Sequence, residues 1–432
     1  MFVSSAGRSP RPDRAGPRRG VGGRAGALVA AWLAAGCAAA PTAVAPAAGP
    51  SSAGAADPAA ATQAGAGAAS APDTAELRRA VVRTYADIAY AAYGDAHRTA
   101  DDLATRVTAF LEAPTEDRMA AAKSAWLAAR DVYGQTEVFR FYDGPIDAAG
   151  GGVEGFVNAW PLDEAYLDYV DGAPDAGIVN AVAQHPKISA RLLLDLNEAG
   201  GETNIATGYH AIEFLLWGQD RTADGPGARP VSDYVVGRGR NAERRRAVLA
   251  IEVDLLSQHL RRVADAWDPD EMAGYRHGFV RDPDAALAKI VTGLTELSGH
   301  ELSGERMAVA YETQDQEDEH SCFSDNTHND LVAGVRGIAT IWRGRYGDVD
   351  GTGLEELVAE VDPAAAANVT AAVDAAQTAM AAIPPPFDQA IRGADDAPGR
   401  RAVMDAMTAL EDLAAKLTSA GATLGVVGGG GA

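Results

Sequence analysis

The sequence predicts an all-α protein whose helices form two bundles of the four-helix type. Hydrophobic residues make up 47% of the chain but aromatic residues only 6%, and much of the apolar share is alanine, which favours helix. Apolar residues recur at spacings of three and four along long stretches, and strand signals are scarce. Long amphipathic helices joined by polar loops are typical of antiparallel bundles.

Taken in order, the helical segments define a folded body from about residue 74 to residue 425. Pro114 ends the first long helix, and Thr115 offers an N-cap to the second. The Gly-, Pro- and Asp-rich stretch 218–241 divides the body into a first bundle, about 74–220, and a second, about 240–425. The long helical segments are residues 74–114, 115–141, 244–268, 283–312, 368–383 and 400–425.

Residues 1–37 have the features of an export signal. An arginine-rich start precedes the short apolar stretch "AGALVAAWLAAGC", which is too short to serve as a stable membrane anchor. Small residues before Cys37 resemble a bacterial lipobox, so we expect Cys37 to be lipidated and the protein to be membrane-anchored, facing the periplasm or the cell surface. The leucine lies one place further out than usual, so plain cleavage and secretion stay an alternative.

The rest of the composition fits an exported, tethered protein. Residues 38–73 are almost entirely Ala, Pro, Gly, Ser and Thr, which predicts a disordered tether. Cys322 has no intramolecular partner if Cys37 carries a lipid, so the fold is not a disulfide scaffold. A formal charge of −23 argues against nucleic acid as a partner.

The stretch "TGYHAIEFLLWGQD" is the first candidate site. We expect one helix over residues 205–217, capped by Thr203 or Asn204 and ended by Gly218, with Gly208 inside it. His210 and Glu213 are three residues apart and share a helix face, so both can reach one metal ion. The alternative is a His–Glu hydrogen bond on a core helix. A glycine at position 208 indicates that another backbone or a ligand comes close.

A second candidate is the acidic stretch 311–331. His320 and His328, with the carboxylates around them, could complete a set of nitrogen and oxygen ligands that suits iron or zinc. The alternative is a solvated acidic surface. Ser324 or Asp325 offers an N-cap to the helix that follows, which places Ser321, Ser324 and His328 near a helix N-terminus.

Four motifs together resemble the imelysin family, the M75 peptidase-like group of bacterial exported proteins. They are "GYHAIEFLLWGQD", "EHSCFSDNTHND", "RFYDGPID" and "NAWPLDEAYLDYV", and the G-x-H-x-x-E hallmark is matched by Gly208, His210 and Glu213. The resemblance spans about residues 75–424. It implies two helical bundles packed side by side, with the G-x-H-x-x-E helix facing a site in the cleft between them.

The resemblance also implies an iron-regulated envelope protein similar to the iron-binding component of iron-uptake systems. His210 and Glu213 are then the metal-binding candidates, and iron or zinc is the expected ion. The expected partners are this metal ion, the membrane through the lipid on Cys37, and iron-uptake proteins or a peptide substrate. The residues expected to line the cleft are Gly208, Glu137, Arg140, Asp147, His320, Ser321, Ser324, Asp325 and His328.

Three functional interpretations stay open at this point. A metallopeptidase needs an open metal position and a general base, and neither Glu137 nor Glu319 is a convincing base. The H-E-x-x-H motif of most zinc peptidases is absent from the sequence. A metal-binding protein needs only ligands and an acidic cleft, so we favour the interpretation that this protein binds a metal ion. An envelope interaction protein without bound metal is the third alternative.

Overall fold

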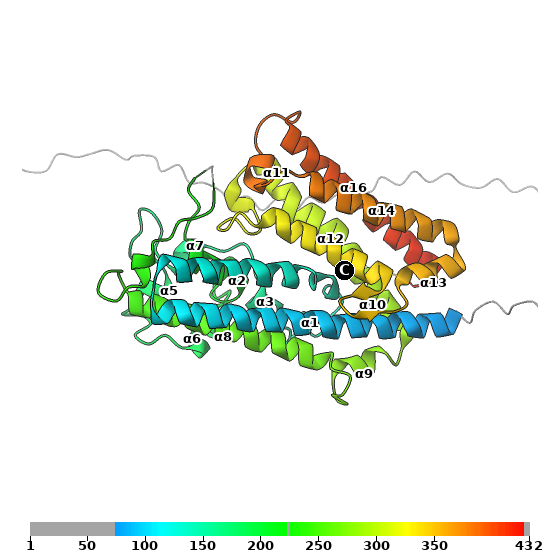
Figure 1. Cartoon of the computed structure of the whole chain (residues 1–432), viewed down its shortest axis with the longest axis horizontal. Coiled ribbons are helices and arrows are strands. Elements are labelled where there is room, and N and C mark those ends of the chain that lie inside the picture. The colour runs from blue at the N-terminus through cyan, green and yellow to red at the C-terminus, as the bar shows by residue number, and fades with distance from the viewer. Residues whose placement is uncertain (1–73, 223–224, 427–432) are drawn as a thin grey trace, which may run out of the picture. The chain divides into compact units, whose positions relative to one another are not determined.

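The structure is a computed structural model that describes residues 74–222 and 225–426. All of these residues fall within one compact unit. The predicted leader, residues 1–37 with Cys37, and the predicted tether, residues 38–73, lie outside the described residues. Helices dominate the described part, which confirms the predicted all-α class (Figure 1).

Long helices carry most of the core, and shorter ones connect them. The longer helices are α1 (Thr74–Glu112), α2 (Glu116–Gly134), α7 (Tyr209–Trp217), α8 (Ala242–Ala266), α10 (Pro283–Thr295), α12 (Thr327–Arg343), α13 (Leu354–Val361), α14 (Pro363–Ala382) and α16 (Pro398–Thr423). The shorter α-helices are α3 (Glu154–Val157), α4 (Glu164–Leu167), α5 (Gly177–Asn180), α6 (Ala190–Leu196), α9 (Tyr275–Phe279), α11 (Val309–Thr313) and α15 (Phe387–Ala390).

Other regular elements are few in the described ranges. Three 3₁₀ turns are η1 (Glu137–Phe139), η2 (Val231–Tyr234) and η4 (Gln316–Asp318). Strands β1 (Arg345–Tyr346) and β2 (Val349–Asp350) pair in a short antiparallel hairpin. The segment η3 (Glu296–Ala308) is a π-helix, so the single helix expected over residues 283–312 is α-helical only at its two ends. No helix in the described ranges is long and apolar enough to cross a membrane.

Several predicted helix ends agree with the structure. The first helix ends at Glu112, two residues before Pro114. Thr115 is the N-cap of α2, and its side chain accepts a hydrogen bond from the backbone N–H of Arg118 at 3.3 Å. Gly218 follows α7 with a φ of 72°, a left-handed conformation that favours glycine at a helix end.

Two predicted caps are wrong. The helix that carries His210 begins at Tyr209 rather than at residue 205, so Gly208 is its N-cap residue and neither Thr203 nor Asn204 is. Helix α12 begins at Thr327, after Asn326, and takes no side-chain cap from Ser324 or Asp325. Ser324 instead bonds to Glu213, and Asp325 adopts a left-handed φ of 56°.

Helix packing crosses the predicted divide at residues 218–241. Helix α1 packs along α2 and α8, while α14 packs along α16 (Figure 1). The π-helix packs on α16, and α12 contacts both α14 and α2. Helix α8 follows the predicted divide in the sequence but packs on α1, so the arrangement as two bundles split at this stretch is not confirmed.

Candidate functional site

Helix α7 is buried along its whole length. It packs between α2 and α8, and every residue from Tyr209 to Trp217 is buried. Its start is fixed by Gly208, which has a φ of 96° and a ψ of −172°, a conformation almost confined to glycine. A Cβ at this position would lie 2.6 Å from the carbonyl oxygen of Val157. The expected close approach at Gly208 is therefore made by another backbone segment.

His210 and Glu213 form a hydrogen-bonded pair inside this helix. Nδ1 of His210 lies 3.0 Å from Oε2 of Glu213. The other oxygen of Glu213 accepts hydrogen bonds from the backbone N–H of Ser324 at 2.9 Å and from its hydroxyl at 2.6 Å. Burial raises the pKa of Glu213 to about 8 and lowers the pKa of His210 well below its usual value. The Nε2 atom of His210 is buried and has no hydrogen-bond partner.

A second histidine–carboxylate pair lies against the first. The rings of His210 and His320 are 4.6 Å apart between centroids, in an edge-to-face arrangement. Nδ1 of His320 lies 2.8 Å from Oδ2 of Asp330, and this carboxylate also accepts a hydrogen bond from the hydroxyl of Ser321 at 2.5 Å. Arg130 of α2 pairs with Asp330 at 3.0 Å. The two histidines thus share one buried polar cluster.

The cluster continues from α2 to the π-helix. Nη1 of Arg130 donates to the side-chain oxygen of Asn158 at 2.5 Å, and the amide of Asn158 donates to Glu137 at 3.0 Å. Glu137 is fully buried and accepts two hydrogen bonds of 2.6 Å from Arg306. Arg306 also contacts Glu301 at 2.6 Å. These bonds offset the cost of burying the charges, which is large for an unpaired group.

The π-helix is what places Glu301 and Arg306 together. Residues five apart lie on the same side of a π-helix, because its hydrogen bonds run between residues i and i+5. In an α-helix the same two residues would point in directions about 140° apart. Arg140 joins the group from the loop after η1, with ion pairs to Glu301 at 3.5 Å, to Glu137 at 3.3 Å and to Glu154 at 3.0 Å.

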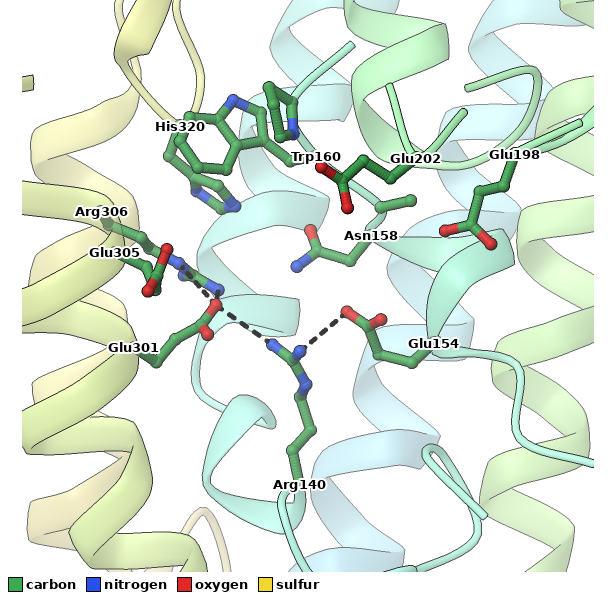
Figure 2. Close-up of a pocket in the computed structure, with 12 residues that line it drawn as sticks. Arg140, Glu154, Asn158, Trp160, Glu198, Glu202, Glu301, Glu305, Arg306 and His320 are labelled. Atoms are coloured by element: carbon green, nitrogen blue, oxygen red, sulfur yellow. Dashed lines mark hydrogen bonds and ion pairs between the residues drawn. The ribbon is translucent and has the colours of Figure 1, made fainter. Parts of the chain in front are cut away.

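A pocket of about 390 Å³ opens beside His320. Figure 2 shows Glu154, Glu198 and Glu202 on one side of it and Glu301, Glu305 and Arg306 on the other. His320 and Trp160 lie at one end and Arg140 at the other (Figure 2). Of the residues that we expected to line the site, Arg140 and His320 line this pocket, and Glu137 lies beneath it in contact with both arginines.

The other expected residues lie elsewhere. Ser321 and Ser324 bond to the two carboxylates behind the histidines. Asp147 accepts the backbone N–H groups of the loop that it closes, among them those of Phe141 at 2.5 Å and Gly144 at 2.7 Å. Asp325 and His328 do not line the pocket either, although Nδ1 of His328 is buried without a partner.

Sequence reasoning missed several residues of the site, namely Arg130, Asn158, Asp330, Arg306, Glu301, Glu154 and Trp160. One signal was available for Arg130, which follows Trp126 by four residues and precedes Tyr133 by three, and so lies on an apolar helix face. A charged residue in such a stripe needs a buried partner. The sequence does not say which of the many carboxylates that partner is.

The described residues contain no group of three or more His, Cys, Asp or Glu side chains placed to hold a metal ion. His210 has the arrangement of a metal ligand, because one ring nitrogen faces a carboxylate and the other is free. Glu213 uses both oxygens in hydrogen bonds, so it orients His210 in this structure. The pair therefore offers one free nitrogen donor, on His210, and not the complete ligand set of a closed structural site.

Glu319 leads to a prediction about pH. This side chain is 1% exposed and its Oε2 atom has no partner. Burial raises its pKa to about 9, with a smaller contribution from the carboxylates Asp388, Asp325 and Asp220, although a hydrogen bond with Thr327 lowers it. In the unfolded chain the Glu319 carboxyl group ionises near pH 4.5, whereas in the folded protein it stays protonated up to about pH 9. The folded state is therefore favoured most below pH 4.5, and this stabilisation is lost as the pH rises towards 9. We expect Glu319→Gln to reduce the loss of stability between pH 5 and 8 by up to about 1 kcal/mol per pH unit.

Chemical denaturation at several pH values measures this effect. Glu360→Gln is the matched control, because Glu360 is exposed on α13. If the slope of unfolding free energy against pH were the same in both variants, the buried position of Glu319 would not be the cause of the slope.

Comparisons with known proteins agree with the fold and with the motif. The family model described as imelysin, peptidase M75, matches residues 89–417. A protein of Synechococcus elongatus named iron-regulated protein A is 26% identical over 321 residues, which cover 72% of this chain and 76% of that protein.

Two solved structures share the fold. A protein of Parabacteroides distasonis described as an iron-regulated protein A precursor has a TM-score of 0.64 at 17% identity, over 82% of this chain and 97% of that one. An imelysin-like protein of Psychrobacter arcticum has a TM-score of 0.59 at 14% identity, over 82% of this chain and 98% of that one. The all-helical fold is therefore shared with both.

Proposed function

Because the chain belongs to the imelysin family, we propose that it is an envelope protein that binds a metal ion at the His210–Glu213 pair, with His210 as ligand and Glu213 holding its ring, in connection with iron acquisition. The observation that carries this proposal is the buried Nε2 atom of His210, which has no partner while Nδ1 is held by Glu213. A buried polar atom without a partner is costly, and coordination to a cation would satisfy it. The name of the Synechococcus relative supports a connection with iron.

The residues of the chain would act on a bound ion in two ways. His210 would supply a neutral nitrogen ligand, since burial and the nearby cations Arg130 and Arg306 keep the pKa of the imidazole low. Glu213 would orient the ring and balance the added charge, with Ser324 holding the carboxylate from its other side. A bound cation supplies positive charge that would favour the ionised form of Glu213.

The proposal includes export and a lipid anchor on Cys37. It rests on the arginine-rich start, the short apolar stretch and the small residues before Cys37. Mass spectrometry of the membrane fraction tests this part, since a Cys37→Ala variant should lose the lipid mass and leave that fraction.

Metal content is the direct test of the site. We expect the full chain, purified without chelator, to carry about one ion per chain, and His210→Ala to lose it. Glu213→Gln is the milder variant, which keeps the shape of the side chain and should weaken retention about 10- to 100-fold. The matched control is His97→Ala with Asp101→Ala, a histidine–carboxylate pair on the surface of α1.

Equal metal content in the His210, Glu213 and His97 variants would remove the metal-binding proposal. The same samples, incubated with an unstructured protein, test the peptidase alternative. Cleavage that disappears with His210→Ala would support a metallopeptidase, and cleavage that survives it would indicate a contaminant.

A further inference from the structure

We infer that the pocket beside His320 binds an organic cation that carries primary ammonium groups. This inference concerns a ligand other than the metal ion, and it does not rest on metal binding, because His210 does not line the pocket. It depends on the charge balance of the pocket, on the acceptors left free in its wall, and on the aromatic ring at its end.

Acidic groups outnumber basic ones around the pocket. The wall and the layer beneath it hold six carboxylates and two guanidinium groups. They are Glu137, Glu154, Glu198, Glu202, Glu301 and Glu305 with Arg140 and Arg306. The arginines are already neutralised, since Nη1 and Nη2 of Arg140 and all three nitrogens of Arg306 contact carboxylate oxygens. Among the side-chain nitrogens of these two arginines, only Nε of Arg140 is without a partner. The remaining charge is negative, so an anion would be repelled and a cation attracted.

The free polar atoms of the wall are mainly hydrogen-bond acceptors. Within the described part of the chain, the carboxylates of Glu198 and Glu202 make no side-chain hydrogen bond or ion pair. Figure 2 shows both on the side of the pocket next to Asn158, whose own amide is bonded to Glu137. A ligand that satisfies these oxygens must bring N–H or O–H donors, and positive charge strengthens such bonds.

His320 adds an acceptor from inside the protein. The side chain is 2% exposed, lines the pocket, and has no partner for Nε2 among the described residues. Nδ1 lies 2.8 Å from the carboxylate of Asp330 and 3.3 Å from Nη2 of Arg130. The shorter contact is with an acceptor, and Nη2 also donates to Asp330 at 3.0 Å, so we place the ring proton on Nδ1. Nε2 therefore presents a lone pair. An acceptor on an almost fully buried side chain, with no protein partner at the wall of a cavity, indicates a donor in the ligand, and this evidence is independent of the surface carboxylates.

Trp160 makes the chemistry more specific. Its Nε1 donates to the carbonyl oxygen of Glu319 at 2.9 Å, which fixes the indole beside His320, with ring centroids 5.6 Å apart. Trp160 lines the same pocket as the carboxylates, and an indole ring attracts ammonium groups. A pocket of about 390 Å³ has room for a linear diamine or polyamine as well as for the side chain of lysine. The shared chemistry of both sources is a primary ammonium group on a flexible apolar chain.

Isothermal titration calorimetry on the full chain, treated with chelator, tests this inference. The probes are putrescine and spermidine for free polyamines, and Nα-acetyl-lysine amide for a peptide side chain. Nα,Nε-diacetyl-lysine amide, which carries no charge, is the negative probe. We expect one site per chain for an ammonium probe, with affinity that falls as salt is added. Glu198→Gln with Glu202→Gln should weaken binding about tenfold or more.

Matched variants separate the pocket from general charge effects. Glu243→Gln with Glu360→Gln removes the same charge from exposed positions on α8 and α13 and should leave binding unchanged. Trp160→Leu should weaken binding severalfold, and circular dichroism shows whether each variant is folded. The inference is overturned if no ammonium probe binds at millimolar concentration, or if the Glu198 and Glu202 variant binds as well as the control variant. The metal content of His210→Ala does not enter into either outcome.

Discussion

Replacing Glu137 with glutamine is expected to lower the free energy of unfolding by about 3–5 kcal/mol. Glu137 is fully buried and holds both Nη atoms of Arg306, which is itself 1% exposed. Glutamine has nearly the same shape but no charge, so Arg306 would keep only Glu301 as a counter-ion. An arginine left without sufficient pairing in the interior costs far more than a lost surface contact. Denaturation by urea, followed by circular dichroism, measures the change.

The control for this variant is Asp131→Asn. Asp131 pairs with Arg336 at 3.1 Å, and both side chains are more than 40% exposed. Removing a surface ion pair should change the unfolding free energy by less than about 1 kcal/mol. A loss of similar size in the two variants would mean that burial does not govern the effect, and would contradict the role that we give to the Glu137–Arg306 pair.

Substituting Gly208 with alanine should destabilise the protein by about 3 kcal/mol or more. The φ of 96° is unfavourable for any residue with a Cβ, and the added carbon would lie 2.6 Å from the carbonyl oxygen of Val157. Either the chain before α7 or the segment around Val157 must move. Because His210 follows two residues later, we expect the same variant to bind less metal even at temperatures where it is folded.

Gly94→Ala provides a control with the opposite sign. Gly94 is inside α1, and a Cβ there would have no atom within 4 Å. Alanine is the better helix former, so the unfolding free energy should rise by up to about 1 kcal/mol. If both substitutions lowered stability equally, the close contact at Gly208 would not explain its effect.

The sequence predicted most of the helices because their signals are local. Apolar spacing located α1, α2, α8, α14 and α16, and Pro114 and Gly218 marked two of the ends. Predictions were wrong where tertiary contacts override local preference. Helix α7 starts later than its cap residues suggest because the backbone of Val157 approaches Gly208. Ser324 does not cap α12 because its hydroxyl is bonded to Glu213.

The site could be predicted only in part, for the same reason. The spacing of His210 and Glu213 on one helix face is a local property, and the structure places them in direct contact. The partners of the network are distant in the sequence: Arg130 pairs with Asp330, and Glu137 with Arg306. The sequence of 432 residues contains 60 acidic side chains, so each buried arginine has too many possible carboxylate partners for the right one to be chosen from sequence alone. Nor does any local pattern that we used distinguish a π-helix from an α-helix.

The π-helix between α10 and α11 makes the site sensitive to chain length as well as to residue identity. Glu301 and Arg306 face the same side only while five residues separate them in this geometry. Deleting a single exposed residue between them, or adding one, would turn Arg306 away from Glu137 although no contact residue had changed. The segment should therefore tolerate many substitutions at exposed positions such as His300 and Glu305 but reject insertions and deletions.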